Sequence, residues 1–205
     1  MVRVKICGVT NLKDALAAID AGADALGFVF AKSPRRIKPS DAAGIIGKLP
    51  VFVNCVGVFV NESVKSVEKI AKQCKLDTLQ FHGEEGPEYC RHFKKTHKVI
   101  KAFKIKDIKS LKIMPRYDVD GYLLDTYARG AVGGTGLVFD WAIAKRAKKM
   151  KSHLILSGGL DVKNVKNAVK IVRPYAVDVS SGVEARPGKK NLKVMREFIK
   201  AVKYE

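Results

Sequence analysis

Short apolar runs with a period of two alternate along the chain with segments whose apolar residues recur every three or four positions. The period-two runs predict β-strands at residues 2–7, 25–30, 53–60, 78–82, 98–103, 121–125, 154–157 and 176–180. The segments with helical period predict helices at residues 12–21, 40–48, 63–73, 87–95, 108–114, 141–149, 162–172 and 192–203. Because a helix follows each strand, the pattern favours a parallel sheet covered by helices.

Eight strand-helix pairs are the number that closes into a (β/α)8 TIM barrel, so the chain is expected to form one such domain over residues 1–205. The main structural alternative is an open, doubly wound sheet. No Gly-x-Gly-x-x-Gly follows the first strand, which argues against that alternative. Helix starts are expected at Asn11, at Ser40 with Asp41, at Asn61 with Glu62, and at Asp140.

Alternation within the strands also predicts which side chains point into the barrel. It places Lys5 with Cys7, Asp178 with Ser180, and Thr78 and Gln80 with His82. A buried charge without a partner is costly, so we expect Lys5 and Asp178 to pair inside the barrel.

Composition narrows the cellular setting and the available chemistry. Hydrophobic residues make up 47% of 205 residues, yet no apolar stretch approaches the roughly 20 residues that cross a membrane, and no secretory signal is recognisable. We therefore expect a cytoplasmic protein. The four cysteines and four histidines show no metal-ligand spacing, which predicts reduced thiols and no structural metal.

The formal net charge is +19, a field that attracts polyanions. One alternative is therefore a basic barrel that binds nucleic acid and has no catalytic activity. The lysines, however, are scattered through the predicted helices and are not interleaved with stacking aromatic residues. A solvated helical exterior is the preferred interpretation, and nucleic acid is not an expected partner.

Two residues at strand ends are candidates for acid-base chemistry. Cys7 ends the first strand and precedes a glycine turn, which presents its thiol, although a lone cysteine often only fills a core. Asp125 ends the sixth strand after two leucines, which would limit its hydration, raise its pKa and suit it to be a general acid. Its alternative role is to anchor a loop or cap a helix. Strands one and six lie across a barrel mouth, so the two groups can flank one small substrate.

Two further sets of residues at the same end suit an anionic ligand. Ser157-Gly158-Gly159 and Ser180-Ser181-Gly182 follow strands seven and eight, where barrels commonly bind phosphate through backbone N–H groups and hydroxyls. The long loop at residues 31–39 carries Arg35 and Arg36, which can offer a planar fork to a carboxylate. The loop at residues 126–139 is rich in glycine and can approach a ligand closely.

Together these residues resemble the phosphoribosylanthranilate isomerase family, (β/α)8 enzymes of tryptophan biosynthesis. The likeness runs essentially end to end and is carried by residues 5–10, 22–24, 27–30, 33–35, 56–61, 80–84, 125–126, 133–136, 139–141, 157–160 and 177–184. It implies an Amadori rearrangement of N-(5-phosphoribosyl)anthranilate to 1-(2-carboxyphenylamino)-1-deoxyribulose 5-phosphate, the third step from chorismate to tryptophan. It also implies a small phosphosugar as partner, no metal and no cofactor, and leaves a monomer and a homodimer open.

The resemblance also implies roles for single residues. Asp125 would be the general acid that opens the furanose ring, and Cys7 the general base that removes the proton from C2. Arg35, with Arg36 as the neighbouring alternative, would meet the anthranilate carboxylate. The remaining implied site residues bind the phosphate or shape the site: Gly158, Gly159, Ser180, Ser181 and Gly182 for the phosphate, and His82, Gly134 and Gly136 for the shape.

The nearest alternative among enzymes is the aminoaldose isomerase of histidine biosynthesis, which performs the same rearrangement on a substrate with two phosphates. That enzyme carries an aspartate where Cys7 stands. It also has a second phosphate site within a half-barrel repeat, which this sequence does not show.

Overall fold

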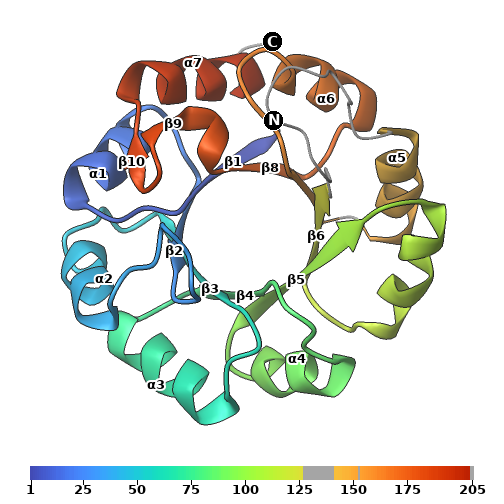
Figure 1. Ribbon diagram of the computed structural model, residues 1–205, viewed down its shortest axis with the longest axis horizontal. Coiled ribbons are helices and arrows are strands. Elements are labelled where there is room, and N and C mark those ends of the chain that lie inside the picture. The colour runs from blue at the N-terminus through green and yellow to red at the C-terminus, as the bar shows by residue number, and fades with distance from the viewer. Residues whose placement is uncertain (127–140, 152, 204–205) are drawn as a thin grey trace.

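The computed structural model describes residues 1–126, 141–151 and 153–203 and contains a closed barrel of eight parallel strands in sequential order (Figure 1). The expected (β/α)8 architecture is confirmed, and the open-sheet alternative is wrong. The barrel strands are β1 (Arg3–Cys7), β2 (Ala25–Val29), β3 (Asn54–Phe59), β4 (Thr78–Phe81), β5 (Lys98–Ile105), β6 (Gly121–Thr126), β7 (Leu154–Ser157) and β8 (Ala176–Val179).

A ring of helices surrounds the barrel in Figure 1. They are α1 (Leu12–Asp20), α2 (Pro39–Ile46), α3 (Val64–Cys74), α4 (Pro87–Lys94), α5 (Trp141–Met150), α6 (Val165–Val172) and α7 (Leu192–Lys203). The connection after β5 is a 3-10 helix, η1 (Ile108–Arg116), and not the α-helix that the pattern predicts. Pro115 within this segment cannot donate a backbone hydrogen bond, which disfavours a regular α-helix there.

Helix starts follow local capping chemistry, and only part of it was predicted. Asn11 caps α1 as expected, because its side chain accepts a hydrogen bond from a backbone N–H of the first turn. The predicted start at Ser40 is wrong, since Pro39 already occupies the first turn of α2. The predicted start at Asn61 is also wrong. Ser63 caps α3, and the Asn61 side chain instead accepts from the N–H of Glu84.

The predicted start at Asp140 lies outside the described residues.

Around the barrel, the larger apolar core lies between strands and helices, whereas the barrel interior holds a small cluster of Ala102, Leu123, Ile155 and Ala176. On β4, Leu79 and Phe81 belong to the outer core and Gln80 lines the interior. The predicted strand faces are thus confirmed, and polar side chains occupy much of the interior.

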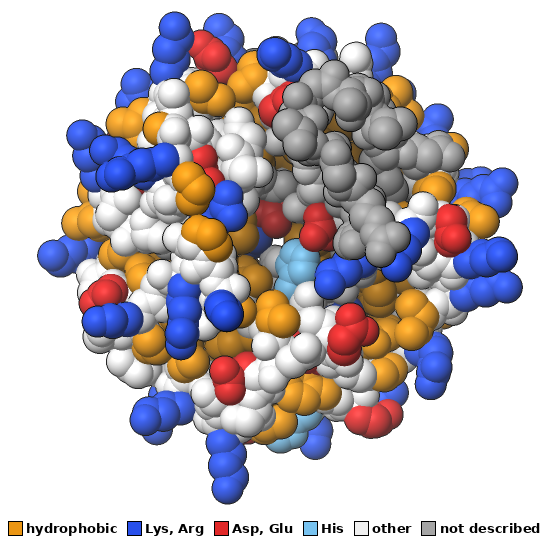
Figure 2. Space-filling model, viewed as in Figure 1, with side chains coloured by type: hydrophobic (Ala, Val, Ile, Leu, Met, Phe, Trp, Pro, Cys, Tyr) orange, Lys and Arg blue, Asp and Glu red, His pale blue; other side chains and the backbone are white. Residues whose placement is uncertain are grey.

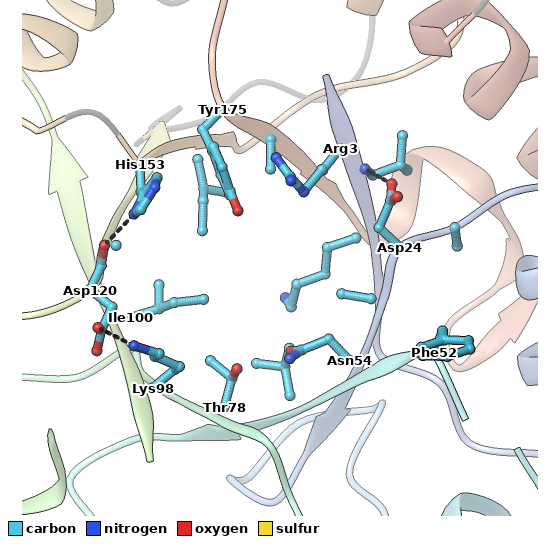
Figure 3. A pocket seen from close by; sticks show the side chains of 18 of the residues that line it. Arg3, Asp24, Phe52, Asn54, Thr78, Lys98, Ile100, Asp120, His153 and Tyr175 are labelled. Carbon is cyan, nitrogen blue, oxygen red and sulfur yellow. Dashed lines mark hydrogen bonds and ion pairs between the residues drawn. The ribbon is translucent and has the colours of Figure 1, made fainter. Parts of the chain in front are cut away.

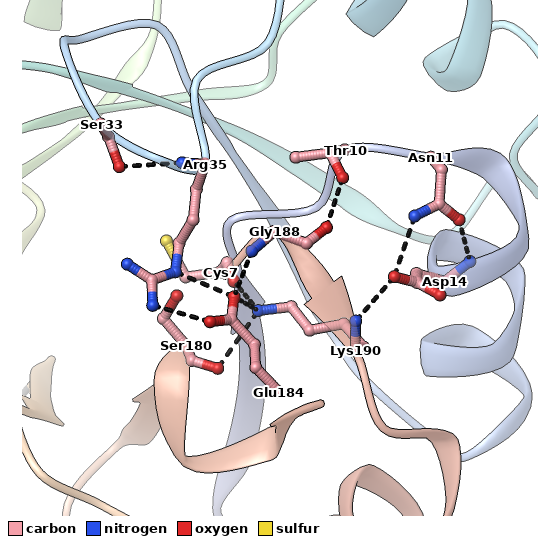
Figure 4. Close-up of polar contacts among 10 residues, drawn as sticks. All are labelled: Cys7, Thr10, Asn11, Asp14, Ser33, Arg35, Ser180, Glu184, Gly188 and Lys190. Carbon is pink, nitrogen blue, oxygen red and sulfur yellow. Dashed lines mark hydrogen bonds and ion pairs between the residues drawn. The ribbon is translucent and has the colours of Figure 1, made fainter. Parts of the chain in front are cut away.

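A short hairpin after β8 was not predicted. It consists of β9 (Glu184–Arg186) and β10 (Lys189–Lys190) and follows a 3-10 turn, η2 (Ser181–Val183). The hairpin brings Lys190 back over the ends of β1 and β8 (Figure 4). In the part of the chain that the structure describes, no helix combines the length and apolar character needed to cross a bilayer.

Candidate active site

A cavity of about 430 Å³ opens at the carboxyl ends of the barrel strands. Figure 2 shows this mouth hollowed at its centre, with a histidine and acidic side chains beside the hollow. All described residues of the predicted site line it: Cys7, Arg35, His82, Asp125, Gly158, Gly159, Ser180, Ser181 and Gly182. The other two predicted residues, Gly134 and Gly136, lie outside the described residues.

Cys7 lies at the base of the cavity, next to a buried ion pair. Lys5 Nζ donates to Asp178 Oδ1 at 2.8 Å, and both side chains are about 5% exposed or less, which confirms the predicted pair. Ser157 Oγ donates to the second oxygen of Asp178. Burial raises the pKa of the Cys7 thiol, and the ammonium groups of Lys5 and Lys190 offset this only in part. The thiol is therefore the resting form at neutral pH, with two cations placed to stabilise the thiolate.

Three charged side chains connect the hairpin to the ends of β1 and β8 (Figure 4). Lys190 Nζ is fully buried and donates to the carbonyls of Cys7 and Ser180 and to Glu184 Oε1. Arg35 binds the same carboxylate through two hydrogen bonds of 2.8 and 2.7 Å. Burial would raise the pKa of Glu184, but the bonds from Arg35 and Lys190 outweigh it and lower the pKa. This carboxylate is thus held ionised between two cations.

The structure distinguishes Arg35 from Arg36, either of which could meet a carboxylate as far as the sequence alone indicates. Arg35 lines the cavity, whereas Arg36 is exposed and does not line it. The Arg35 stem packs against Gly8, where an added Cβ would lie 2.6 Å from Arg35 Cδ and where φ is +74°. Only glycine fits this turn without displacing the arginine. At the end of this stem, the Arg35 guanidinium is held in its plane by Glu184, which accepts hydrogen bonds from Nε and Nη2. The third nitrogen, Nη1, takes no part in that pair.

A chain of polar contacts crosses the cavity from β4 to β6. His82 Nε2 lies 3.0 Å from Asp125 Oδ2, and His82 Nδ1 lies 3.0 Å from Gln80 Nε2. The Asp125 side chain is about one-third exposed at the mouth, while Gln80 is buried. Leu123 and Leu124, which precede Asp125 on β6, are fully buried, as the sequence suggested. The direct contact between His82 and Asp125 was not predicted.

The two Ser-Gly segments form one side of the cavity. Gly158 and Gly159 have φ of +80° and +65°, a backbone form that favours glycine. An added Cβ on Gly182 would lie 2.0 Å from the carbonyl oxygen of Leu160, so the segments after β7 and β8 touch backbone to backbone. Ser180 Oγ is buried and has no hydrogen-bond partner among the described residues. This arrangement leaves donors available for an anion.

Sequence reasoning missed the roles of Gln80, Glu184 and Lys190. Alternation did place Gln80 inside the barrel, and its neighbour His82 two residues on was the available signal. Lys190 lies in a hairpin that the pattern did not predict, so no periodicity indicated its burial. Within the described residues, no cluster of three or more His, Cys, Asp or Glu side chains is arranged to hold a metal ion.

Comparison with known proteins adds three findings. The sequence profile of the family described as N-(5'phosphoribosyl)anthranilate (PRA) isomerase matches residues 4–201. The N-(5'-phosphoribosyl)anthranilate isomerase of Geobacter sulfurreducens is 54% identical over 204 residues, which cover 99% of each chain. Several solved structures match over the full length of both chains, and two of them illustrate the likeness.

The first of these structures is a phosphoribosyl anthranilate isomerase in complex with reduced 1-(o-carboxyphenylamino)-1-deoxyribulose 5-phosphate, with a TM-score of 0.91 and 45% identity. The second is described as mutually generated monomers of the dimeric enzyme from Thermotoga maritima, with a TM-score of 0.90 and 44% identity. The likeness therefore covers both sequence and fold from end to end.

Proposed function

Because the chain belongs to the N-(5'-phosphoribosyl)anthranilate isomerase family, we propose that Cys7 and Asp125 perform the acid-base chemistry of this reaction. The chain is an isomerase of tryptophan biosynthesis that converts N-(5-phosphoribosyl)anthranilate to 1-(2-carboxyphenylamino)-1-deoxyribulose 5-phosphate. The observation that carries the assignment is that both groups line one cavity, together with the two Ser-Gly segments.

The first step is acid-catalysed opening of the sugar ring. Asp125 gives its proton to the furanose oxygen, the C1–O bond breaks towards that oxygen, and the nitrogen lone pair forms a C=N bond to C1. Asp125 suits this step because it lies at the mouth, bonded to His82, where it can regain a proton. The product of the step is an open-chain iminium ion.

The second step is removal of the proton from C2 by Cys7. The C–H electron pair forms a C1–C2 double bond, and the C=N electrons return to nitrogen to give an enolamine. Tautomerisation, with a proton gained at C1 and one lost from the C2 hydroxyl, gives the aminoketose. Burial raises the pKa of Cys7 and disfavours the thiolate. The cations of Lys5 and Lys190, and the iminium itself, act in the opposite direction and favour the thiolate. The iminium is the electron sink, so the chemistry requires neither metal nor cofactor.

The remaining site residues bind the two anionic ends of the substrate. Gly158, Gly159, Ser180, Ser181 and Gly182 hold the phosphate, which supplies a partner for the buried Ser180 hydroxyl. Arg35 faces the anthranilate carboxylate, and Glu184 holds its guanidinium in place. His82 positions Asp125. Gly134 and Gly136 complete the site in this proposal.

Two substitutions test the assignment. Cys7→Ala and Asp125→Asn should each fold normally and lower kcat by about 100-fold to 10,000-fold. The assay follows the loss of anthranilate-like fluorescence with freshly made phosphoribosylanthranilate. Cys55→Ala, which removes a buried cysteine outside the cavity, is the matched control and should retain activity. Near-normal turnover in either site variant would refute the role assigned to that residue.

The partner is a small phosphosugar, with no membrane and no nucleic acid; RNA binding that weakens steeply with added salt would contradict this. Residues 1–205 act as one barrel domain in the cytoplasm, consistent with four free cysteines. The active form is a monomer or a homodimer, which light scattering of the purified chain distinguishes.

A further inference from the structure

A buried amide that contacts His82, the partner of Asp125, has a hydrogen-bond partner at only one of its two polar atoms. Gln80 is 1% exposed, and its Nε2 lies 3.0 Å from His82 Nδ1. Its Oε1 is buried with no hydrogen-bond partner in the described part of the chain. A buried polar atom without a partner costs free energy, so it requires an explanation.

The amide can face His82 in two ways with the same number of hydrogen bonds. With Nε2 towards the ring, Gln80 donates to Nδ1 and leaves its oxygen unpartnered. After a half turn of the amide, Oε1 takes that place, accepts a proton held on Nδ1 and leaves the NH2 group unpartnered. Neither orientation gains a contact over the other, so the hydrogen-bond count does not fix the amide.

The two orientations differ in the protons that the ring can hold. When Nδ1 accepts from Gln80, the neutral ring carries its proton on Nε2 and donates it to Asp125, which favours the ionised carboxylate because a charged acceptor binds the N–H more strongly. When Nδ1 donates to Gln80 Oε1, the proton between Nε2 and Asp125 is an additional one. That second state is equivalent to a neutral histidine accepting from a protonated Asp125.

We propose that Gln80 is a positioning residue that controls the proton inventory of the His82–Asp125 pair, and that the reactive enzyme has Oε1 facing Nδ1. This inference rests on the proposed role of Asp125 as general acid. The Oε1-facing state stabilises the proton that Asp125 delivers to the furanose oxygen. After that delivery the pair regains a proton from water at the mouth, where Asp125 is about one-third exposed.

Other charged and titratable groups surround the pair, and Lys104 on β5 lies beside Asp125 in register. Cys7, Lys32, Arg35 and Asp178 line the same cavity. Asp178 is bound to Lys5, and Arg35 is bound to Glu184. On the other side of β4, Lys101 is buried against Glu85. Gln80 itself contacts His82 Nδ1, so the amide acts directly on where the imidazole ring holds its protons.

The first test is the pH profile of kcat in two variants. Activity should fall on the alkaline side as the His82–Asp125 pair loses its proton. Gln80→Glu places a carboxylate that can only favour a proton on Nδ1, and should move this alkaline limb up by one pH unit or more. Gln80→Met cannot bond to the ring; it should lower kcat about tenfold, move the limb down and change KM less than threefold. Thr78→Val, on the same face of β4 at the opposite end of the barrel, is the control and should change neither.

The second test reads the ring directly and needs no turnover. In ¹⁵N spectra, with His82 assigned by its loss in His82→Asn, Nδ1 should carry a proton when reduced 1-(o-carboxyphenylamino)-1-deoxyribulose 5-phosphate is bound. Gln80→Glu should show the same signal without ligand. An unprotonated Nδ1 in the complex, or an unmoved alkaline limb in Gln80→Glu, overturns this inference while leaving an inactive Asp125→Asn in support of the general acid. An active Asp125→Asn overturns both.

Discussion

The two ends of the barrel each hold a cavity, and the larger one is not the site. The cavity at the amino ends of the strands measures about 680 Å³, against about 430 Å³ at the carboxyl ends (Figure 3). At the amino end the carboxylates serve the fold: Asp24 accepts the N–H of Val4 and binds Lys203, and Asp120 accepts the N–H of Val99.

The carboxyl end instead leaves capacity unused. Gln80 Oε1 and Ser180 Oγ, both at this end, are the buried side-chain polar atoms without a partner among the described residues. The cavity at the amino ends of the strands is the lower cavity, and the one at the carboxyl ends is the upper cavity. Lys5 lines the lower cavity and its partner Asp178 lines the upper one, so this ion pair lies between the two. Unpaired polar atoms, and not volume, distinguish the chemical end of the barrel.

The largest difference between the two ends of the barrel is expected when one methyl group is added at each of them. Gly182→Ala should lower kcat/KM by about 100-fold, because the new Cβ would lie 2.0 Å from the Leu160 carbonyl and displace the phosphate segment. Gly121→Ala at the lower cavity meets atoms at 3.4 Å or more and should change kcat/KM less than twofold. Steady-state kinetics with the fluorescence assay measure both. Equal losses would show that the two ends are equally sensitive.

A second difference is expected between two lysines, Lys5 in the ion pair between the two cavities and Lys98 at the exposed edge of the lower cavity. Lys5→Met leaves Asp178 buried without its cation and should lower the free energy of unfolding by about 3–5 kcal/mol. Lys98→Met removes a lysine whose side chain is 74% exposed and should change that free energy by less than about 0.5 kcal/mol. Urea unfolding followed by circular dichroism gives both values. A stable Lys5→Met would mean that the pair does not support the barrel.

A smaller effect is expected where the upper cavity holds Arg35. Glu184→Gln should lower the free energy of unfolding at pH 7 by about 1.5–3 kcal/mol, because it weakens hydrogen bonds to two cations. Since the folded pKa of Glu184 is lowered, this stabilisation is complete above the unfolded pKa of about 4.3 and is lost as pH falls through the folded value. Unfolding at pH 7 and at acid pH should therefore show the two proteins converging. A constant difference would contradict an ionised Glu184.

The smallest effect is expected at the lower rim. Phe52 is 98% exposed beside the lower cavity, so Phe52→Ser should leave kcat/KM unchanged and alter the free energy of unfolding by less than about 0.5 kcal/mol at a concentration where the chain is monomeric. Kinetics and urea titration check this. A large loss of turnover would show that the lower end contributes to catalysis after all.

Periodicity predicted the barrel because the strands and helices repeat a local pattern that needs no tertiary information. Within the described residues, for instance, each of the seven α-helices begins within three residues of the first residue of its predicted range. Cys7 and Asp125 were also within reach, because strand ends in a barrel converge on one mouth. Local sequence patterns do not indicate a residue's role where tertiary contacts decide it. Asn61 has the side chain of a helix cap, yet its oxygen is committed to the N–H of Glu84 across a loop.

The side-chain network around the site was out of reach for the same reason. Lys190 is one of many lysines in a strongly basic chain, and nothing local distinguishes it from those on the surface. Its burial depends on a hairpin of two short strands and on acceptors supplied by β1, β8 and Glu184. Likewise, the bond between His82 and Asp125 joins residues from different strands, a relation that one-dimensional patterns do not contain.

The position of Lys190 along the chain has a consequence for synthesis. Lys190 follows Cys7 by 183 residues, so the ammonium that binds the Cys7 carbonyl is synthesised long after the thiol. During synthesis from the N-terminus, the ends of β1 and β8 therefore lack this contact until Lys190 has been added. A fragment that ends before Lys190 is expected to lack the contacts that join Cys7, Ser180 and Glu184, and to lose isomerase activity.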